Sequence, residues 1–503
     1  MAKRPWLNCI LSLGLALSLS ACGQPPAQPG SSVSTPEPGL SQPEQQTAHS
    51  WTLAAFTDQS FHPILSSSRT NLTLAPLMYE GLFQLDTSFA PQPVLCSSYE
   101  TSEDGLVWTF TLHPNITFSD GTPLTAPLVV QALELARTGT SPYSGRFSGI
   151  ASISAPTGEQ LVITLTQPNT ALPSLLDIPI PLDGSDRPLG TGPYVLTQGA
   201  EDSLSLNART DWWQGRSPSP NRIQLLGVTQ PDTLKRSFER GALSLVNTDP
   251  TATDAAGYSG TYQTTDYDTT SLVYLGFNAA RSPLYSVPAR RAVAAALDRS
   301  QLVSAACSGH ARAAALPIHP ASPLYNDTLA RQLPGPEQAQ ELMEQAGLSG
   351  RRLTLLVNRE NSSKVTAAQL IARQLEKAGL SVTVSSLPWA DYTAALSNGQ
   401  FDLYLGEVTL TADFDLTPLV GSGGAVNYSR WRSTQADSLL RACRSASVET
   451  RPSQVSELCS LLTSEMPLAT LYFERGSVLT QWGLFPSLTP TRANVFFGLI
   501  SEK

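Results

Sequence analysis

Three carboxylates lie within nine residues in the second half of the chain: Glu407, Asp413 and Asp415. They follow an apolar run at residues 401–405, which predicts a buried strand. In open α/β sheets, ligands bind beyond the carboxyl ends of the strands, so this pattern indicates a site for a cationic group. The alternative is a solvated loop in which Asp415 caps a helix.

Motifs of hydrolytic enzymes do not occur in the sequence, which contains no G-x-S-x-G, H-E-x-x-H or S-x-x-K. The five histidines are scattered without the spacing of metal ligands. They are His49, His62, His113, His310 and His319. We therefore expect no catalysis, no metal site and no cofactor.

A strand–helix–strand unit precedes the carboxylates. Residues 353–357 and 382–384 are short apolar runs, and apolar residues between them recur at helical spacing from Val365 to Leu375, before Gly379. Such a unit requires a parallel sheet with a right-handed crossover. A short helix at residues 390–397 and the strand at 401–405 add a second unit, so the predicted fold class is α/β.

The length of 503 residues predicts two or three domains, because a single core does not grow this large. Hydrophobic residues make up 41% of the chain and charged residues 15%, as in an ordinary folded protein. The net charge of −9 makes nucleic acid an unfavourable partner.

The first 22 residues indicate export. Lys3 and Arg4 precede an apolar stretch at residues 7–19 that is too short to span a membrane. The Leu-Ser-Ala-Cys sequence that ends at Cys22 resembles the lipobox of bacterial lipoproteins, which implies a signal peptide at residues 1–21 and a lipidated Cys22. The alternative is a plain signal peptide with a coincidental cysteine. No later stretch reaches the roughly 20 apolar residues of a membrane helix, so we expect contact with the bilayer through Cys22 only.

Residues 22–48 predict a tether between this anchor and the folded part. The segment is rich in Pro, Ser, Gln and Gly and has hardly any apolar side chains, so it cannot form a core. As a flexible coil it reaches on the order of 30 Å.

After the tether, residues 51–56 predict a first strand, and residues 106–112 alternate as a half-buried antiparallel strand. At the other end of the chain, residues 484–499 are too few and too weakly periodic to form a domain. We therefore expect this last segment to pack on an earlier part of the chain.

Five short motifs follow one another along the chain. They are Tyr79-Glu80-Gly81-Leu82, residues 119–126, Gly190-Thr191-Gly192-Pro193-Tyr194, residues 290–293 leading to 296–299, and Phe401-Asp402-Leu403 followed by Ala412-Asp413-Phe414. In this order and spacing they resemble the family 5 extracellular solute-binding proteins of ABC importers, of the oligopeptide-, dipeptide- and nickel-binding type. The resemblance runs from about Trp51 to the C-terminus.

The resemblance implies a periplasmic-binding-protein-like fold of class II, with two lobes joined by hinge segments. Carried onto this sequence, lobe I covers residues 49–271, with an inserted subdomain at about 91–181, and residues 481–503 return to it. Lobe II covers residues 272–480, with hinge strands at 272–278 and 471–480.

The implied function is capture of a peptide or peptide-like cationic solute between the lobes and delivery to an ABC permease, by a monomeric lipoprotein on the extracytoplasmic face of the cell membrane. One alternative is a sensor that presents a peptide signal without transport. Another is a binder of a nickel chelate, a polyamine or an opine.

The resemblance also implies ligand-binding residues. In oligopeptide-binding relatives, an Asp at the position of Asp413 holds the α-amine of the peptide. The relatives read Ala-Asp-aromatic-x-Asp-Pro, whereas here Asp415 comes one residue early without the Pro, so Asp413 and Asp415 both remain candidates. Glu407 stands where relatives have Trp, which would make the pocket more acidic unless Glu407 lies exposed in a longer loop.

Other candidates follow from position. Ser67 and Arg69 lie where relatives contact ligand from lobe I, and Arg69 is suited to bind a carboxylate bidentately. Each tryptophan of the pair Trp389 and Trp431 is a candidate cleft wall or a core residue. Asn427 and Tyr428 follow a glycine-rich run that is suited to folding over a bound main chain.

Cysteine positions predict one disulfide. Cys443 and Cys459 fall at similar depth on two predicted helices, residues 435–445 and 453–464, that are joined by a short turn. Export permits oxidation, and closing so short a loop adds about 3 kcal/mol in the chain-entropy model. Cys96 and Cys307 belong to different expected lobes, so we expect them to be unpaired.

Overall fold

The structure is a computed structural model, and it describes residues 51–253, 255, 257–281 and 283–499. The predicted signal peptide, Cys22 and the tether lie outside the described residues, as do residues 500–503. Within the described ranges, every helix is too short or too polar to cross a membrane.

A 4-stranded sheet contains the first strand of the chain. Its elements and their neighbours are β1 (Trp51–Phe56), α1 (Arg69–Met78), β8 (Tyr194–Gln198), η3 (Ala200–Asp202), β9 (Leu204–Ala208), β10 (Arg222–Val228) and α3 (Pro231–Glu239). The strand order is β1-β10-β9-β8, and β1 pairs with β10 in parallel. The last segment of the chain packs on β1, with the rings of Trp51 and Phe485 4.8 Å apart. The expectation that this segment packs on an earlier element is confirmed.

A second 4-stranded sheet is antiparallel and carries its own core. It belongs to a region with the elements β2 (Phe83–Leu85), β3 (Pro91–Pro93), β4 (Cys96–Thr101), β5 (Val107–Leu112), α2 (Ala126–Arg137), η1 (Ser144–Phe147), β6 (Ile150–Ser154), β7 (Gln160–Leu165) and η2 (Leu172–Leu175). The sheet order is β4-β5-β7-β6. The predicted alternation is confirmed in β5, where Trp108, Phe110 and Leu112 are buried and pack with the apolar face of α2.

A 7-stranded sheet organises the rest of the chain. Its strands are β11 (Leu245–Thr248), β12 (Gln263–Phe277), β13 (Ala311–Ala313), β14 (Arg352–Asn358), β15 (Ser381–Leu387), β16 (Leu403–Thr409) and β17 (Leu468–Thr480). The helices of this region are α4 (Val287–Ala295), α5 (Arg299–Ala306), α6 (Asp327–Arg331), η4 (Pro336–Gln338), α7 (Ala339–Gln345), α8 (Ser362–Lys377), α9 (Trp389–Asn398), α10 (Thr417–Val420), α11 (Thr434–Ser445) and α12 (Arg451–Glu465).

The predicted strand–helix–strand unit is confirmed. Strands β14 and β15 are parallel, with Leu353 opposite Val382, and α8 connects them. The buried residues of α8 include Ala368, Ile371 and Leu375 of the predicted stripe. Strand β16 adds in parallel on the other side of β14.

Strand β16 is longer than its apolar run predicts. It pairs with β12 in antiparallel orientation through its whole length, and Glu407 lies opposite Val273. This pairing keeps the backbone extended beyond residue 405. Glu407 therefore belongs to the strand, whereas Asp413 and Asp415 follow its end.

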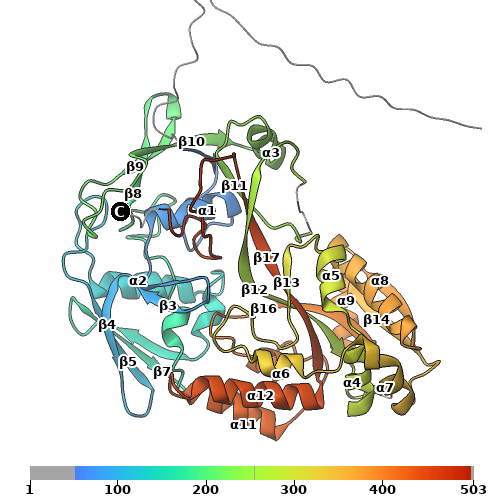
Figure 1. Cartoon of the computed structure of the whole chain (residues 1–503). Coiled ribbons are helices and arrows are strands. Elements are labelled where there is room, and N and C mark those ends of the chain that lie inside the picture. Colours follow the sequence, from blue (N-terminus) through green and yellow to red (C-terminus); the bar gives the residue numbers. More distant parts are fainter. Residues whose placement is uncertain (1–50, 254, 256, 282, 500–503) are drawn as a thin grey trace, which may run out of the picture. The chain divides into compact units, whose positions relative to one another are not determined.

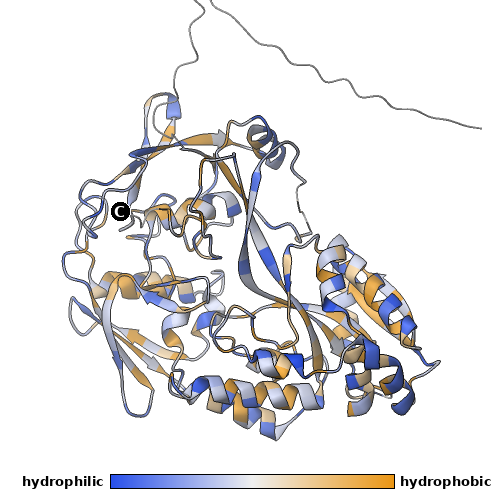
Figure 2. Cartoon of the chain, in the orientation of Figure 1, coloured by the Kyte–Doolittle hydropathy of each residue, from blue (hydrophilic) through white to orange (hydrophobic). Residues whose placement is uncertain are grey.

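Two long neighbouring strands, β12 and β17, cross this region side by side (Figure 1). The first half of β12 is polar and the second half is apolar (Figure 2). The ladder between the two strands is interrupted between Asp268 and Leu272 and resumes at Leu272, which lies opposite Phe473. The two strands start earlier than the expected hinge segments, since β12 begins at Gln263 and β17 at Leu468.

Candidate functional site

A cavity of about 1480 Å³ opens beside β12 and β17. Its walls come from separate parts of the chain. They include α1 with Leu72 and Pro76, the segment around Phe83 and Phe89, the region of η1, the first half of β12, residues 409–412, and residues 488–494 and 496–498. A cavity this large exceeds the roughly 300–1,000 Å³ of ordinary small-molecule pockets.

Charged side chains of the two long strands face this cavity. Asp266 and Asp268 are two residues apart on β12 and therefore point to the same side of the sheet. They lie opposite Ser477 and Arg475 of β17. Asp266, Asp268 and Arg475 all line the cavity.

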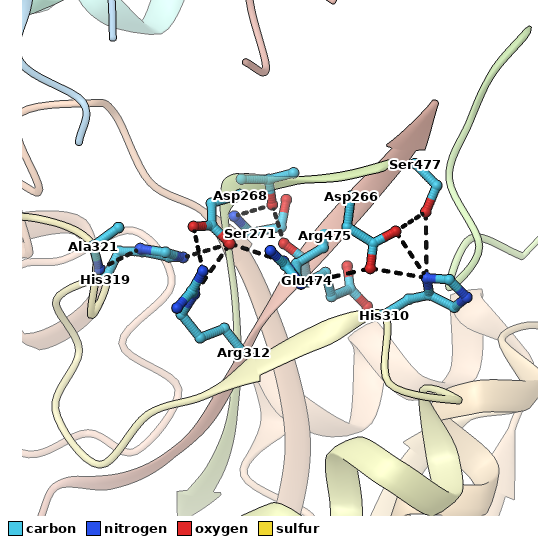
Figure 3. Close-up of polar contacts among 11 residues, drawn as sticks. Asp266, Asp268, Ser271, His310, Arg312, His319, Ala321, Glu474, Arg475 and Ser477 are labelled. Carbon is cyan, nitrogen blue, oxygen red and sulfur yellow. Dashed lines mark hydrogen bonds and ion pairs between the residues drawn. The ribbon is translucent and has the colours of Figure 1, made fainter. Parts of the chain in front are cut away.

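Asp268 joins three strands through two guanidinium groups (Figure 3). Its Oδ1 accepts a hydrogen bond from Nε of Arg475 at 2.9 Å, and its Oδ2 accepts one from Nη2 of Arg312, in β13, at 2.9 Å. Arg475 also lies 3.5 Å from Asp266, so two carboxylates and two guanidinium groups balance one another. This arrangement fixes the side chains where the ladder is interrupted.

Asp266 binds a histidine and a serine. Nδ1 of His310 lies 3.1 Å from its Oδ1, and the Ser477 hydroxyl donates to the same oxygen at 2.6 Å. The hydrogen bond that Asp266 accepts from His310 raises the pKa of His310. Burial by itself raises the pKa of Asp266, but hydrogen bonds from His310 and Ser477 bring it below its ordinary value.

The Asp266–His310–Ser477 contact contains the residue types of a hydrolase triad but not its geometry. The Ser477 hydroxyl donates to the carboxylate, and Ser477 is only 1% exposed. A nucleophile must instead give its proton to the imidazole and reach the substrate. The hydrogen bonds of this cluster therefore hold the charged side chains in fixed positions.

A second histidine, His319, lies beside Asp268, with its Nε2 3.7 Å from Oδ1 of the carboxylate. Its ring packs edge-on against Phe89 and Phe473, with centroids 4.9 and 4.8 Å away. Burial lowers the pKa of His319 to about 4, so its imidazole is neutral at pH 7. Its Nδ1 accepts from the backbone N–H of Ala321 at 3.0 Å.

The candidate ligand residues from the sequence do not lie among the cavity-lining residues. The residues concerned are Ser67, Arg69, Trp389, Glu407, Asp413, Asp415, Asn427, Tyr428 and Trp431. Their contact with a solute stays a prediction. Some of these residues lie on the surface and others in the core.

Asp413 is buried beside the cavity, 4% exposed, and its neighbours Thr411 and Ala412 line it. Its carboxylate accepts from the Thr411 hydroxyl at 2.5 Å and from Nδ2 of Asn169 at 3.3 Å. The guanidinium of Arg451 donates to the backbone oxygen of Asp413 at 2.6 Å. The carboxylate thus already has partners, one of them from the region of the second sheet.

Asp415 lies just before α10 but is not its N-cap, which is Leu416, so the helix-capping alternative is not confirmed. Its Oδ1 accepts from the backbone N–H of Thr417, at the start of α10, at 3.0 Å. Glu407 forms an ion pair with the buried Lys364. Its negative charge is therefore compensated within the protein and does not make the cavity more acidic.

The remaining candidates lie on the surface or in the core. Ser67 and Arg69 are exposed at the start of α1, where Ser68 is the N-cap. Trp389 is 59% exposed, whereas Trp431 is buried in a core. Asn427 donates to the backbone oxygens of Gly421 and Trp431, both at 2.9 Å, and the Tyr428 ring packs edge-on against Tyr404.

The predicted disulfide is not formed. Helices α11 and α12 match the two predicted helices, but Cys443 and Cys459 are both buried free thiols. Burial raises the pKa of Cys443 to about 11 and of Cys459 to about 12, and so suppresses the thiolates that oxidation requires. Cys96 and Cys307 are free as well, as expected.

The cluster around Asp266 and Asp268 was missed in the sequence because its members come from three distant strands. One signal was available. The segment that precedes the apolar run at residue 272 carries Asp266 and Asp268 with the spacing of one strand face, and Arg475 interrupts the other apolar run.

The fold is that of the two-lobed periplasmic binding proteins. A murein tripeptide-binding protein, MppA, in an unliganded open form, superposes with a TM-score of 0.75 and 19% identity, covering 89% of this chain and 95% of that chain. A family model described as bacterial extracellular solute-binding proteins, family 5 Middle, matches residues 90–427, more than half of the chain. The chain belongs to this family, whose members bind a small solute and work with the permease of an ABC importer.

Two relatives illustrate the range of solutes in the family. The glutathione-binding protein GsiB of Salmonella paratyphi A is 24% identical over 445 residues, covering 82% of this chain and 86% of that protein. The heme-binding protein A of Haemophilus influenzae is 25% identical over 398 residues, covering 69% of this chain and 72% of that protein. These relatives are binding proteins, and their solutes differ widely.

Proposed function

We propose that this chain captures a peptide or peptide-like solute in the cavity beside β12 and β17 and delivers it to an ABC permease from a lipid-anchored position on the extracytoplasmic face. The observation that carries the proposal is the cavity itself, with about 1480 Å³ of space between walls from several segments of the chain. This volume accommodates a solute of several residues.

The lining suits a peptide in two respects. Aromatic and aliphatic groups such as Leu72, Phe83, Phe89 and Phe496 offer apolar contact, while charged groups lie at a few separate positions. Such a mixture orients a solute through its polar groups and gains affinity from its apolar surface. Similarity to a murein tripeptide-binding protein and to glutathione-binding proteins supports the same solute class.

Fluorescence titration tests solute capture, because Trp212 and Trp213 belong to the cavity lining. We expect a mixed tripeptide library to change the tryptophan emission of the purified protein in a saturable way. Heme, nickel–histidine and spermidine serve as competing classes. A saturable response to one of these, with none to peptides, would contradict the peptide proposal.

Lipid anchoring has its own test at Cys22. A Cys22→Ser variant, expressed in a bacterium with lipoprotein processing, is expected to leave the membrane fraction, whereas the parent chain remains in it. A Cys96→Ser variant is the matched control, since Cys96 is a buried free thiol of the folded part. Membrane association that is equal in all three proteins would contradict the proposed anchor.

A further inference from the structure

The last segment of the chain brings an arginine into the cavity. Residues 488–494 and 496–498 line it, and the rings of Phe485 and Phe496 hold this segment against Trp51. Arg492 projects from the segment, and its Nη1 donates a hydrogen bond to the hydroxyl of Thr270 at 2.5 Å. Thr270 in turn donates to the backbone oxygen of Leu410 at 2.6 Å. The guanidinium is thus attached to the cavity wall at one nitrogen.

A second arginine, Arg146 in η1, approaches from another wall. It pairs with Asp177, donates to the backbone oxygen of Leu175 at 3.1 Å, and lies over the Tyr143 ring at 4.9 Å from its centroid. These contacts hold Arg146 in one place. Both Arg146 and Asp177 line the cavity.

The two arginines share one nearby carboxylate. In the part of the chain that the structure describes, Arg492 forms no ion pair, and its hydrogen bond goes to a neutral hydroxyl. Burial lowers the pKa of Arg492, and the positive charge of Arg146 lowers it further, whereas Asp177 acts in the opposite direction. This corner of the cavity therefore carries a surplus of positive charge.

Elsewhere in the lining, acidic groups are satisfied within the protein. Asp266 and Asp268 bind His310, Arg312 and Arg475. Glu80 is buried, and burial raises its pKa to about 7, while Trp213, Thr191 and Gln214 donate to it. An anion bound at the Arg492 corner would therefore interact with a positive charge that the protein itself leaves uncompensated.

We propose that Arg492 and Arg146 form a subsite that binds a carboxylate of the solute. A guanidinium presents two parallel N–H groups that match the two oxygens of a carboxylate, and Arg492 keeps nitrogens available beyond the one that Thr270 occupies. Tyr143 borders the same corner; burial raises its pKa, so its hydroxyl stays neutral and can donate. The proposal rests on the proposed function, since it names the group by which the captured solute is held.

Calorimetric titration of the purified protein with two tripeptide libraries tests the subsite. One library ends in free carboxylates and the other in amides, with the same residues. We expect the free acids to bind the parent protein about tenfold more tightly, because charge-assisted hydrogen bonds are stronger than neutral ones. In Arg492→Gln this difference is expected to disappear, with the affinity for the amides unchanged.

Two further variants sharpen the test. Arg146→Gln is expected to reduce the same difference, and Arg492→Lys to retain part of it through the remaining charge. Arg222→Gln removes an equal charge from an exposed position that does not line the cavity, and is expected to keep the full difference. An acid–amide difference of the same size in Arg492→Gln and the parent protein would overturn the proposal.

A small dicarboxylate separates this proposal from the peptide function. If neither library binds the parent protein, the peptide proposal fails, and succinate decides the subsite alone. We expect succinate to bind the parent protein and to bind Arg492→Gln about tenfold more weakly, since a charged partner is lost. Equal binding to both proteins, or no binding to the parent, would overturn the subsite.

Discussion

Asp268 and Arg475 face each other across β12 and β17 as register partners, with Oδ1 and Nε 2.9 Å apart at the point where the ladder between the strands is interrupted. The Asp268 side chain is 12% exposed, and it also holds Arg312. We expect Asp268→Asn to lower the free energy of unfolding by about 1–2 kcal/mol, because it removes the carboxylate of Arg312 and one of the two carboxylates that Arg475 contacts. Urea denaturation measures this change.

A double-mutant cycle is the control for this pair. In an Arg475→Gln background, Asp268→Asn should cost less, because one of the two guanidinium groups that bind Asp268 is already absent. If the aspartate substitution costs the same in both backgrounds, the two side chains do not interact energetically.

The Asp266–His310 contact predicts a stability term that depends on pH. The pKa of His310 is raised, so its stabilisation is complete below the unfolded value near 6.5 and is lost as pH rises through the folded value. The pKa of Asp266 is lowered, so its contribution is lost only in acid, below about 4. We expect His310→Gln to be less stable than the parent by up to about 1 kcal/mol at pH 5.5 and by less at pH 8.5. A deficit that grows with pH would contradict the pairing.

Glu474 predicts a destabilising contribution that grows as pH rises. Burial raises the pKa of its carboxyl to about 8, and the charge of Glu407 adds to this. The unfolded residue ionises near 4.5, so unfolding releases a proton between these two values, and stability falls as pH rises through that range. We expect Glu474→Gln to gain roughly 1–3 kcal/mol relative to the parent between pH 5 and pH 8 in thermal or urea unfolding. Parallel pH profiles for the two proteins would show that Glu474 is ionised when folded.

The substitutions Asp413→Asn and Asp415→Asn test which of the two residues holds a solute amine, because each removes a charge without shortening the side chain. Asp413→Asn preserves the shape and removes the charge, so a solute amine held there should lose on the order of a hundredfold in affinity, while an N-acetylated solute is unaffected. Asp415→Asn should lower stability by up to about 1 kcal/mol, because its carboxylate accepts from Thr417 and pairs with Arg444, and leave the preference for the amine intact. The reverse pattern would place the anchor at Asp415, and an unchanged preference in both would exclude an amine anchor here.

Elements that a local pattern specifies were predictable from the sequence. The α8 stripe and the alternation of β5 depend on side chains within a few residues of one another, and the parallel pairing of β14 with β15 follows from the single helix that connects them. The extent of β12 was not predictable in this way. Its polar first half is extended because it pairs with β17, some two hundred residues later in the chain.

The site was less predictable for the same physical reason. A motif locates Asp413, but only the fold reveals that Asn169 already donates to its carboxylate and that Lys364 neutralises Glu407. Arg492 lies in a segment without periodicity, and its position depends on the aromatic contacts of Phe485 and Phe496 with Trp51. Charges that matter for binding are those left unpaired by the fold, and pairing across such distances is not visible in a single sequence.

The contact of Trp51 with Phe485 also has a consequence for the order of folding. The first strand of the folded part completes its core only with residues from the end of the chain, so this contact has nearly the largest loop-closure cost that the described chain offers. Contacts of such high sequence separation form late and slow the folding of a domain. A growing or translocating chain therefore emerges with the core around β1 incomplete, and this core closes only after synthesis of the last segment.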